Sequence, residues 1–150
     1  MEGQILAINI TEKNSGKRRS VEEAFLCPGQ GIGGDDTSGQ NNGEISMISQ
    51  STYEQMREMG VDFFYGDFGE NLRVDGLTVG RLPAGSQVQI GEAVLEVLEN
   101  DNNFFSHYVT VRGYAGELTI LPDKIHASVV VGGEIKADDK IRVLHESLPQ

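Results

Sequence analysis

Glycine constrains the fold of this chain more than any other feature of the sequence. It occupies 19 of the 150 positions, well above the roughly 7% of average proteins, and the glycines are scattered rather than repeated. They separate short apolar runs rich in Val and Ile, which favour β-strands. This arrangement predicts short strands joined by tight turns. A chain of 150 residues is expected to form one domain, residues 1–150, with a buried core of its own.

Short apolar runs predict strands over residues 4–10, 20–26 and 44–49. Before the third of them lies a stretch of sixteen residues, 28–43, with six glycines and no apolar periodicity. A loop of that length inside a compact domain is usually functional or disordered.

Two further units follow in the second half of the chain. Residues 88–98 predict a hairpin with its turn at Gly91-Glu92 and a second strand buried on both faces. Residues 127–131 and 140–144 predict a second, hairpin-like unit around the segment VGGEIKADD.

A helix is predicted over residues 52–59, with Ser51 as its cap, Glu54 completing a capping box and Gly60 ending it. Because strands dominate and helices do not alternate with them, a βαβ sheet does not fit. The sequence predicts a mainly β fold, a small closed or partly open β-barrel with one or two short helices.

The charge balance excludes several partners. With 23 acidic and 12 basic residues the net charge is −11, which repels nucleic acid and anionic membranes. Any anionic ligand therefore needs a locally basic pocket. No apolar run approaches the roughly 20 residues that span a bilayer, and a single cysteine, Cys27, allows no intrachain disulfide. We expect a cytoplasmic protein that binds neither nucleic acid nor membrane.

Two motifs in the long loop have weak chemical meaning by themselves. Residues 29–34 match the GxGxxG pattern of dinucleotide-binding proteins, but DDTSGQNNG follows and cannot begin the helix that the pattern requires. Asp35 and Asp36 offer carboxylates, yet no calcium-loop pattern surrounds them, and a solvated turn explains them better. We predict no metal site.

Cys27 and His107 are the only candidates for catalytic groups, and both are weak. Cys27 has no partner cysteine for zinc, and as a nucleophile it needs cationic neighbours such as Lys17, Arg18 or Arg19. Ser106 and His107 are adjacent, so on a strand they point to opposite faces and form no dyad. They remain a plausible polar lining of a pocket.

Five segments, taken in order, resemble the MOSC domain, named for the C-terminal part of molybdenum-cofactor sulfurases. They are GIGGDDTSG, EISMIS, GDFGENLRVDGL, LPAGSQVQIGEAVLEVLE and ASVVVGGEIKADDKIRV. Their order and spacing match nearly the whole chain, from about Ile5 to Val143, and the chain looks like the small stand-alone form found in bacteria. The resemblance implies a β-barrel that handles molybdopterin or the molybdenum cofactor.

The resemblance also implies where the ligand binds. In the family, the Gly-Asp of the long loop and the Gly-Glu-Asn motif lie near one pocket, which points to Asp35, Gly69, Glu70 and Asn71. Glu70 and Asn71 can meet the edges of a pterin ring, although they can equally tie down loops by bonding backbone amides. Arg73, Arg112 and one of Lys17, Arg18 or Arg19 are candidates for the terminal phosphate.

The sequence departs from the family where sulfur chemistry is expected. Stand-alone members usually carry Cys-His-x-x-Cys after the LEV strand, and the matching positions here are Ser106, His107 and Thr110. Thr37 stands where the family's Gly-Asp-x-His has its His. A hydroxyl carries no persulfide, because sulfur transfer needs a thiolate.

The leading hypothesis is therefore a module that binds molybdopterin or the molybdenum cofactor without persulfide chemistry, related to cofactor sulfuration or delivery. Its partners would be that small molecule and possibly a molybdoenzyme or a cofactor-biosynthesis protein. No pyridoxal phosphate is expected. The expected pocket residues are Asp35, Thr37, Gly69, Glu70, Asn71, Arg73, Ser106, His107, Thr110 and Arg112.

Two alternatives remain open, and whether the protein is an enzyme stays undecided between them. One is a sulfur carrier or transferase that uses Cys27. The other is a non-catalytic barrel that binds a protein through an apolar patch, for which residues 63–65 and 104–105 supply aromatic side chains.

Overall fold

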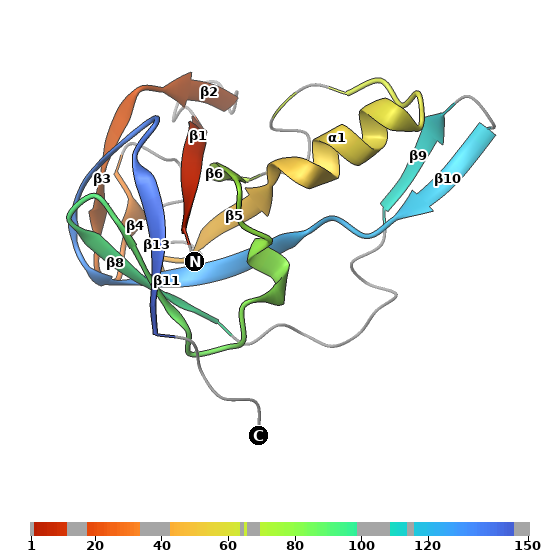
Figure 1. Cartoon of the computed structure of the whole chain (residues 1–150). Coiled ribbons are helices and arrows are strands. Elements are labelled where there is room, and N and C mark those ends of the chain that lie inside the picture. The colour runs from red at the N-terminus through yellow and green to blue at the C-terminus, as the bar shows by residue number, and fades with distance from the viewer. Residues whose placement is uncertain are drawn as a thin grey trace.

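The computed structural model describes residues 2–11, 18–33, 43–63, 65, 70–98, 109–113 and 116–145. One α-helix and one short 3-10 helix lie among strands (Figure 1). In chain order the elements are β1 (Glu2–Thr11), β2 (Arg18–Val21), β3 (Glu23–Cys27), β4 (Gly31–Ile32), β5 (Ile45–Ser49), α1 (Gln50–Glu58), β6 (Leu72–Asp75), η1 (Val79–Arg81), β7 (Gln87–Ile90), β8 (Ala93–Val97), β9 (Val109–Gly113), β10 (Gly116–Ile120), β11 (Lys124–Val131), β12 (Gly133–Lys136) and β13 (Lys140–His145).

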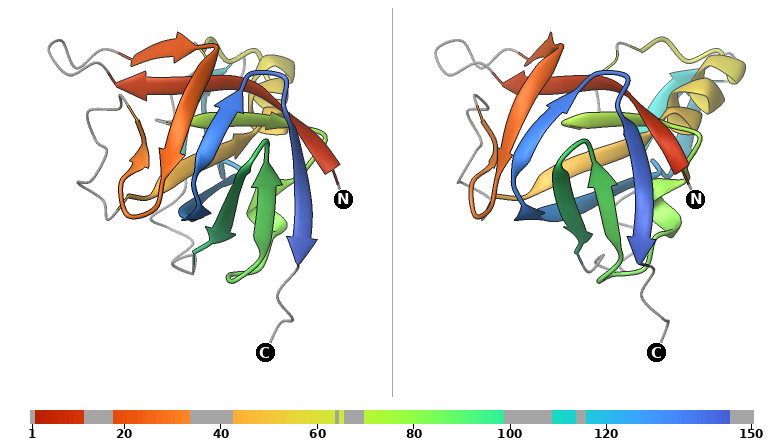
Figure 2. Two further views of the ribbon diagram at one scale, coloured as in Figure 1. Left: turned by 90° about the vertical axis from the view of Figure 1, so that its left-hand side faces the viewer. Right: turned by 60° about the vertical axis from the view of Figure 1, so that its left-hand side comes forward.

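Seven strands close into a barrel (Figure 2). They follow the order β13-β7-β8-β11-β5-β6-β1, and β1 pairs back onto β13 through Glu2–Arg142, Gly3–Ile141 and Gln4–Lys140. β2 extends the sheet outside the ring by pairing with β1. The mainly β barrel predicted from the sequence is thus confirmed. Closure matters because it leaves these strands without the exposed edge that an open sheet offers to other chains.

Every barrel strand contributes to one apolar core, and alternation along the strands explains how. On β8 the side chains at positions 93, 95 and 97 are buried, whereas those at 94 and 96 are only partly covered. The second strand of this hairpin is therefore buried mainly on one face, contrary to the prediction. The fully covered core residues contributed by the barrel strands are Ile5, Ile8, Ile45, Met47, Leu72, Val74, Val88, Ile90, Ala93, Leu95, Ile125, Ala127 and Ile141.

A small second sheet, in the order β12-β3-β4, adds to the same core. It corrects the hairpin predicted around residues 127–144. The intervening segment forms β12, which pairs with β3 from Gly133–Leu26 to Lys136–Glu23. The flanking strands go to different neighbours: β11 lies between β8 and β5, and β13 lies between β7 and β1. Local alternation could not reveal this long-range pairing.

Helix α1 begins earlier than predicted. Its N-cap is Ser49, with no side-chain capping bond, so the capping box of Ser51 and Glu54 is wrong. The Ser49 hydroxyl instead donates to the carbonyl of Leu77 and accepts from the N–H of Val79, each at 2.9 Å. A hydroxyl engaged with η1 cannot also cap the helix.

The end of α1 agrees with the prediction. Gly60 has φ +72° and its N–H donates to the carbonyl of Arg57 at 3.1 Å. A glycine in this left-handed conformation is the common way to end a helix.

The helix covers a second, smaller apolar cluster outside the barrel. Ile48 of β5 packs there with Tyr53 and Met56 of α1 and with Val61 and Ile120. Because the helix side contributes Tyr53 and Met56, three positions apart, one face of α1 is held against β5. All five residues of β5 are buried, since one face of the strand meets the barrel core and the other lies beneath this cluster and the site described below.

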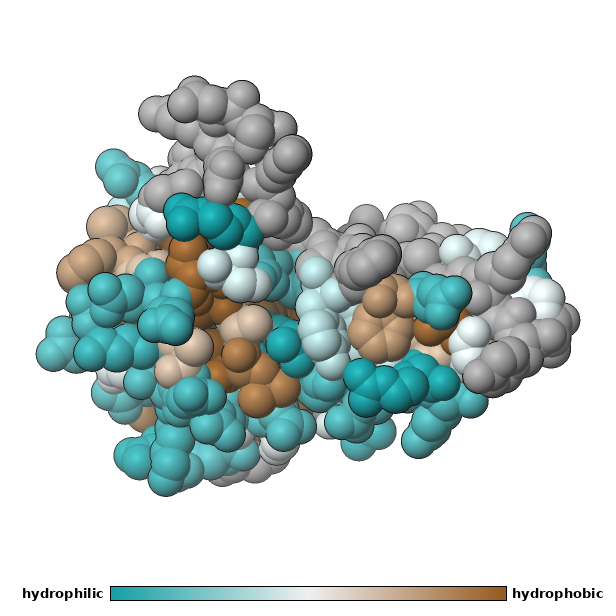
Figure 3. Space-filling view, turned by 90° about the horizontal axis from the view of Figure 1, so that it is seen from above, coloured by the Kyte–Doolittle hydropathy of each residue, from teal (hydrophilic) through white to brown (hydrophobic). Residues whose placement is uncertain are grey.

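The view from above separates the two parts of the molecule (Figure 3). Hydrophobic side chains show through at the end of the barrel, bordered by hydrophilic ones, while α1 and the β9–β10 hairpin form the narrower part to the right. The sheet of β9 and β10 contains only these two strands.

Gly43, at the end of the long loop, lies close to the backbone of Gly29 and Gln30 at its beginning. It has φ +74°, and a Cβ atom there would lie 2.6 Å from the carbonyl carbon of Gly29 and 2.7 Å from the nitrogen of Gln30. Gly29 has a similar φ of +78° but no atom within 4 Å of such a Cβ.

We expect Gly43→Ala to lower the free energy of unfolding clearly more than Gly29→Ala. Both variants place alanine in the left-handed region, at a cost of roughly 1–2 kcal/mol, but only the first also pushes backbone against backbone. Urea unfolding followed by circular dichroism measures the difference. Equal destabilisation by the two variants would contradict the close contact.

Candidate functional site

The candidate site lies where the chain crosses from β5 to β6. These strands are parallel neighbours, paired from Met47–Leu72 to Ser49–Val74, so the chain must travel back along the barrel before it can pair. Helix α1 belongs to that crossing, and so do the described residues 59–63, 65, 70 and 71. The described part of the GDFGENLRV segment, from Glu70 onward, therefore lies beside both strands and α1.

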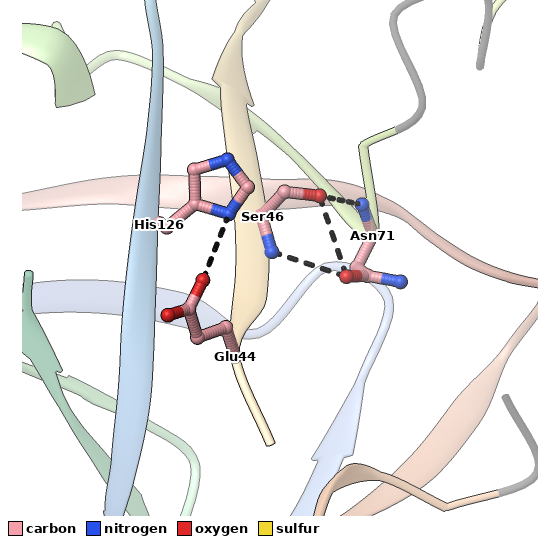
Figure 4. Close-up of polar contacts among 4 residues, drawn as sticks. All are labelled: Glu44, Ser46, Asn71 and His126. Carbon is pink, nitrogen blue, oxygen red and sulfur yellow. Dashed lines mark hydrogen bonds and ion pairs between the residues drawn. The ribbon is translucent and has the colours of Figure 1, made fainter. Parts of the chain in front are cut away.

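Asn71 is hydrogen-bonded to Ser46 of β5 (Figure 4) and to Asn9 of β1. Its Oδ1 accepts from the backbone N–H of Ser46 at 3.0 Å and from the Ser46 hydroxyl at 3.3 Å, and its Nδ2 donates to the carbonyl of Asn9 at 3.2 Å. Its backbone N–H donates to Ser46. The side chain thus holds β1, β5 and the start of β6 together. Asn71 as a contact to the cofactor stays a prediction, and a ligand would have to displace these bonds.

We expect Asn71→Ala to destabilise the fold by about 2–4 kcal/mol, because it leaves buried donors and acceptors on two strands without partners. Asn71→Asp keeps the acceptor for Ser46 and should unfold at a urea concentration between those of the wild type and Asn71→Ala. If Asn71→Ala unfolded at the same urea concentration as the wild type, these hydrogen bonds would contribute little to stability.

Figure 4 also shows a more exposed ion pair, formed by Glu44 directly before β5 and His126. The Nδ1 atom of His126 on β11 lies 3.7 Å from Oε2 of Glu44, and both side chains are substantially exposed to solvent. His126 therefore lies at the surface with a weak ionic partner.

Glu70 is buried completely and tied to α1. The hydroxyl of Tyr53, also fully buried, donates to its Oε1. The backbone carbonyl of Glu70 accepts from the amide of Asn9 at 3.4 Å. A carboxylate in such a position must be hydrogen-bonded to be tolerated, and this bond joins the chain before β6 to the buried face of the helix.

Arg73 lies across the gap between β6 and the helix. Its Nη1 donates to Oε1 of Gln50 at 2.6 Å, and its guanidinium carbon lies 3.8 Å from the centre of the Tyr65 ring. Its Nε is buried and hydrogen-bonds no residue in the described part of the chain. A buried N–H of a cation is expected to meet an acceptor, so this atom is where a ligand oxygen or a water fits best.

Tyr65 joins the two sides of this arrangement. Its hydroxyl accepts from Nη2 of Arg57 at 3.1 Å, and its ring packs edge-on with Tyr53 and Phe63 at centroid distances of 5.0 and 5.5 Å. The pKa of Tyr65 is lowered, first by a hydrogen bond with Gln50 and then by a hydrogen bond and charge from Arg57 and the charge of Arg73; burial acts in the opposite direction. The hydrogen bond with Gln50 and the two arginines thus all favour the phenolate form of Tyr65.

The phenolate of Tyr65 should form at lower pH than that of an ordinary tyrosine. Since the folded protein releases this proton more readily than the unfolded chain, the associated stability is gained as pH rises through the folded pKa and lost as pH falls through it. Tyrosine ionisation can be followed by absorbance at 295 nm during alkaline titration. The transition at the lowest pH should be missing in Tyr65→Phe. The transition should move up in Arg57→Gln and stay in place in Arg81→Gln, a change at an exposed arginine elsewhere. An unchanged first transition in Tyr65→Phe would assign it to another tyrosine.

The remaining predicted site residues divide into two groups. Thr110 lies on β9 and is exposed, and Arg112 lies on the same strand, where only its backbone is described. Asp35, Thr37, Gly69, Ser106 and His107 lie outside the described residues.

Cys27 stands apart from the residues around α1. It is exposed, at the end of β3, and β3 and α1 lie on opposite sides of the molecule (Figures 1 and 2). In the described ranges no group of three or more His, Cys, Asp and Glu side chains is arranged to hold a metal ion.

Sequence reasoning identified Glu70 and Arg73 but missed the residues that surround them. Tyr53 and Arg57 were read only as parts of a helix, Gln50 lay before the predicted helix, and Tyr65 was read only as one of three aromatic residues. The signal that was available is their spacing: positions 50, 53 and 57 lie on one face of a helix. Only the crossover shows that this face meets β6.

Comparisons with known proteins agree with this architecture. A family model described as the MOSC domain matches residues 34–103. The structure is similar to that of YuaD from Bacillus subtilis, with a TM-score of 0.68 and 20% identity over 99% of this chain and 98% of that one. It is similar to YiiM from Escherichia coli (TM-score 0.58, 20% identity, 97% of this chain and 72% of that one) and to YiiM from Geobacillus stearothermophilus (0.61, 16%, 95% and 75%).

At such identities these likenesses establish the fold alone. No curated protein sequence matches the chain. Within the described residues, no helix has the length and apolar character needed to cross a membrane.

Proposed function

Because the chain belongs to the MOSC domain family, a family related to the molybdenum cofactor, we propose that it binds molybdopterin or the molybdenum cofactor as a binding or delivery module. In this proposal it performs no persulfide step of its own. Bound molybdopterin would supply a terminal phosphate and a planar pterin ring with hydrogen-bonding edges. The residues of this chain would bind and orient that molecule.

The observation that carries the proposal is the incomplete hydrogen bonding of the Arg73 guanidinium among the described residues. Its guanidinium is fixed by Gln50 and by the face of Tyr65, and its buried Nε has no hydrogen-bond partner in the described residues. A fixed, incompletely bonded guanidinium suits a phosphate oxygen, since arginine binds phosphate through paired N–H groups. The donor set therefore fits the anionic end of the cofactor.

The absence of a sulfur step rests on the sequence and on Cys27. Ser106 and Thr110 occupy the positions of the family's cysteines, and their hydroxyls cannot form a persulfide. The single thiol is exposed at the end of β3, and β3 and α1 lie on opposite sides of the molecule (Figures 1 and 2). A sulfur atom on Cys27 would therefore lie on the side opposite the helix that borders the proposed site.

Titration with molybdenum-cofactor extract should raise the melting temperature in a saturable way, because a ligand that binds only the native state stabilises it. We expect Arg73→Gln to weaken the apparent affinity by about tenfold or more, the value of a charged hydrogen bond. Arg81→Gln, at an exposed position, is the matched control and should bind as the wild type does. Cys27→Ser should also bind normally. Urea unfolding of each variant separates loss of binding from loss of fold.

Two results would contradict the proposal. A shift that disappears in Cys27→Ser would favour the alternative of a sulfur carrier centred on that thiol. No shift in the wild type would mean that the barrel has the family's fold without its ligand, and protein partners would then become the leading alternative.

A further inference from the structure

Two arginines from different elements converge on one tyrosine. Arg57 reaches the Tyr65 hydroxyl from the exposed side of α1, with Nη2 at 3.1 Å, and Arg73 reaches the ring from β6, with its guanidinium carbon 3.8 Å from the ring centre. Both guanidiniums therefore lie within one side-chain length of the same ring. Arg57 also lies 5.8 Å from the ring centre of Phe63.

Neither arginine has a carboxylate partner among the described residues, where no carboxylate lies within ion-pair distance of Arg57 or Arg73. The salt bridges that are formed there include Lys136–Glu134, Lys140–Glu2 and Arg142–Glu2. The chain has 23 acidic residues against 12 basic ones, so carboxylates are plentiful elsewhere. Two neighbouring cations without counter-ions repel each other, and an anion between them removes that cost.

We propose that Arg57, Arg73 and the Tyr65 hydroxyl together form an oxyanion subsite for a doubly charged phosphate monoester. This rests on the proposed function, and it adds Arg57 and Tyr65 to the site and names the charge state of the ligand that it takes. Arg73 supplies the buried Nε donor, Arg57 supplies a second, more exposed guanidinium, and the phenol O–H can donate to the same anion.

The groups around Tyr65 that the structure describes make its surroundings positively charged. Among the described residues, its charged or titratable contacts are Arg57 and Tyr53 from α1 and Arg73 from β6, and Phe63 and Gln50 also contact it. The carboxylate of Glu70 lies behind Tyr53, whose hydroxyl binds it. Gln50 fixes Arg73 through its amide oxygen, so it is a positioning residue rather than a ligand contact.

The first test uses inorganic phosphate as the probe, compared with chloride at equal ionic strength. Wild-type protein should bind phosphate, measured by calorimetry at pH 7.5, where the dianion predominates. Arg57→Gln should weaken that binding by about tenfold, the loss expected for one charge-assisted contact. Arg81→Gln should not change it. Glutamine has nearly the helix propensity of arginine, so the fold should be retained, as urea unfolding would verify.

A second readout distinguishes direct contact from a general charge effect. A bound anion stabilises the protonated phenol, so saturating phosphate should raise the pKa of Tyr65 toward its ordinary value, followed by absorbance at 295 nm. The effect should vanish in Tyr65→Phe and shrink in Arg57→Gln. Binding should also strengthen from pH 5 to pH 7.5 as phosphate loses its second proton, with a pKa near 6–7.

Two outcomes would overturn the inference. One is phosphate binding that is unchanged in Arg57→Gln, and the other is a Tyr65 titration that phosphate does not move. If the wild type nevertheless binds molybdenum-cofactor extract and loses it in Arg73→Gln, the proposed function stands and only the two-arginine subsite is wrong. If phosphate binds as described and the extract does not, the subsite stands and its ligand is a different phosphate monoester.

Discussion

The parallel pairing of β5 with β6 is the constraint on which the site depends. Parallel neighbours cannot be joined by a tight turn, so the chain leaves β5 at Ser49 and forms α1 before it pairs with β5 again as β6. Every other pairing recorded within the barrel ring is antiparallel. The one crossover therefore brings a helix face and the start of β6 together, and it is there that Tyr53 meets Glu70 and Gln50 meets Arg73.

Three residues close in sequence are used for three purposes. Asn71 faces β1 and β5 and completes their hydrogen bonds, Glu70 binds the buried side of α1, and Arg73 spans to Gln50 and Tyr65. The motif is thus partly framework and partly site. This division explains how a family pattern can persist in a chain that lacks the family's cysteines, because the framework bonds are needed for folding whatever chemistry the pocket performs.

The strands near residues 4–10 and 44–49 and the end of the helix could be predicted because they depend on local patterns: short apolar runs for the strands, and a glycine at position 60 for the helix end. The start of the helix could not, because its N-cap, Ser49, forms no side-chain capping bond, and the Ser49 hydroxyl is bound to Leu77 and Val79 instead. The pairing of β12 with β3 was missed for a similar reason. It joins residues about a hundred positions apart, and no periodicity encodes such a partner.

The sequence pointed to those residues of the candidate site that belong to a motif, and it missed those that do not. Glu70 and Arg73 lie in a recognisable segment, whereas Arg57 and Tyr65 belong to no motif and are united only by the crossover. Asp35, Thr37 and the Ser106–His107 segment remain predictions, because they lie outside the described residues.

An acidic protein can still bind an anion if the nearest charges are positive. At an effective dielectric constant of about 20, a charge pair 4 Å apart interacts by roughly 4 kcal/mol before desolvation is counted. Charges beyond about 8 Å are largely screened at physiological salt. The net charge of −11 therefore slows the approach of an anion more than it lowers the affinity of the bound anion. Two guanidiniums beside one tyrosine, with no carboxylate partner in the described part of the chain, outweigh distant surface carboxylates. Overall acidity is therefore no argument against a phosphate-bearing ligand at this place.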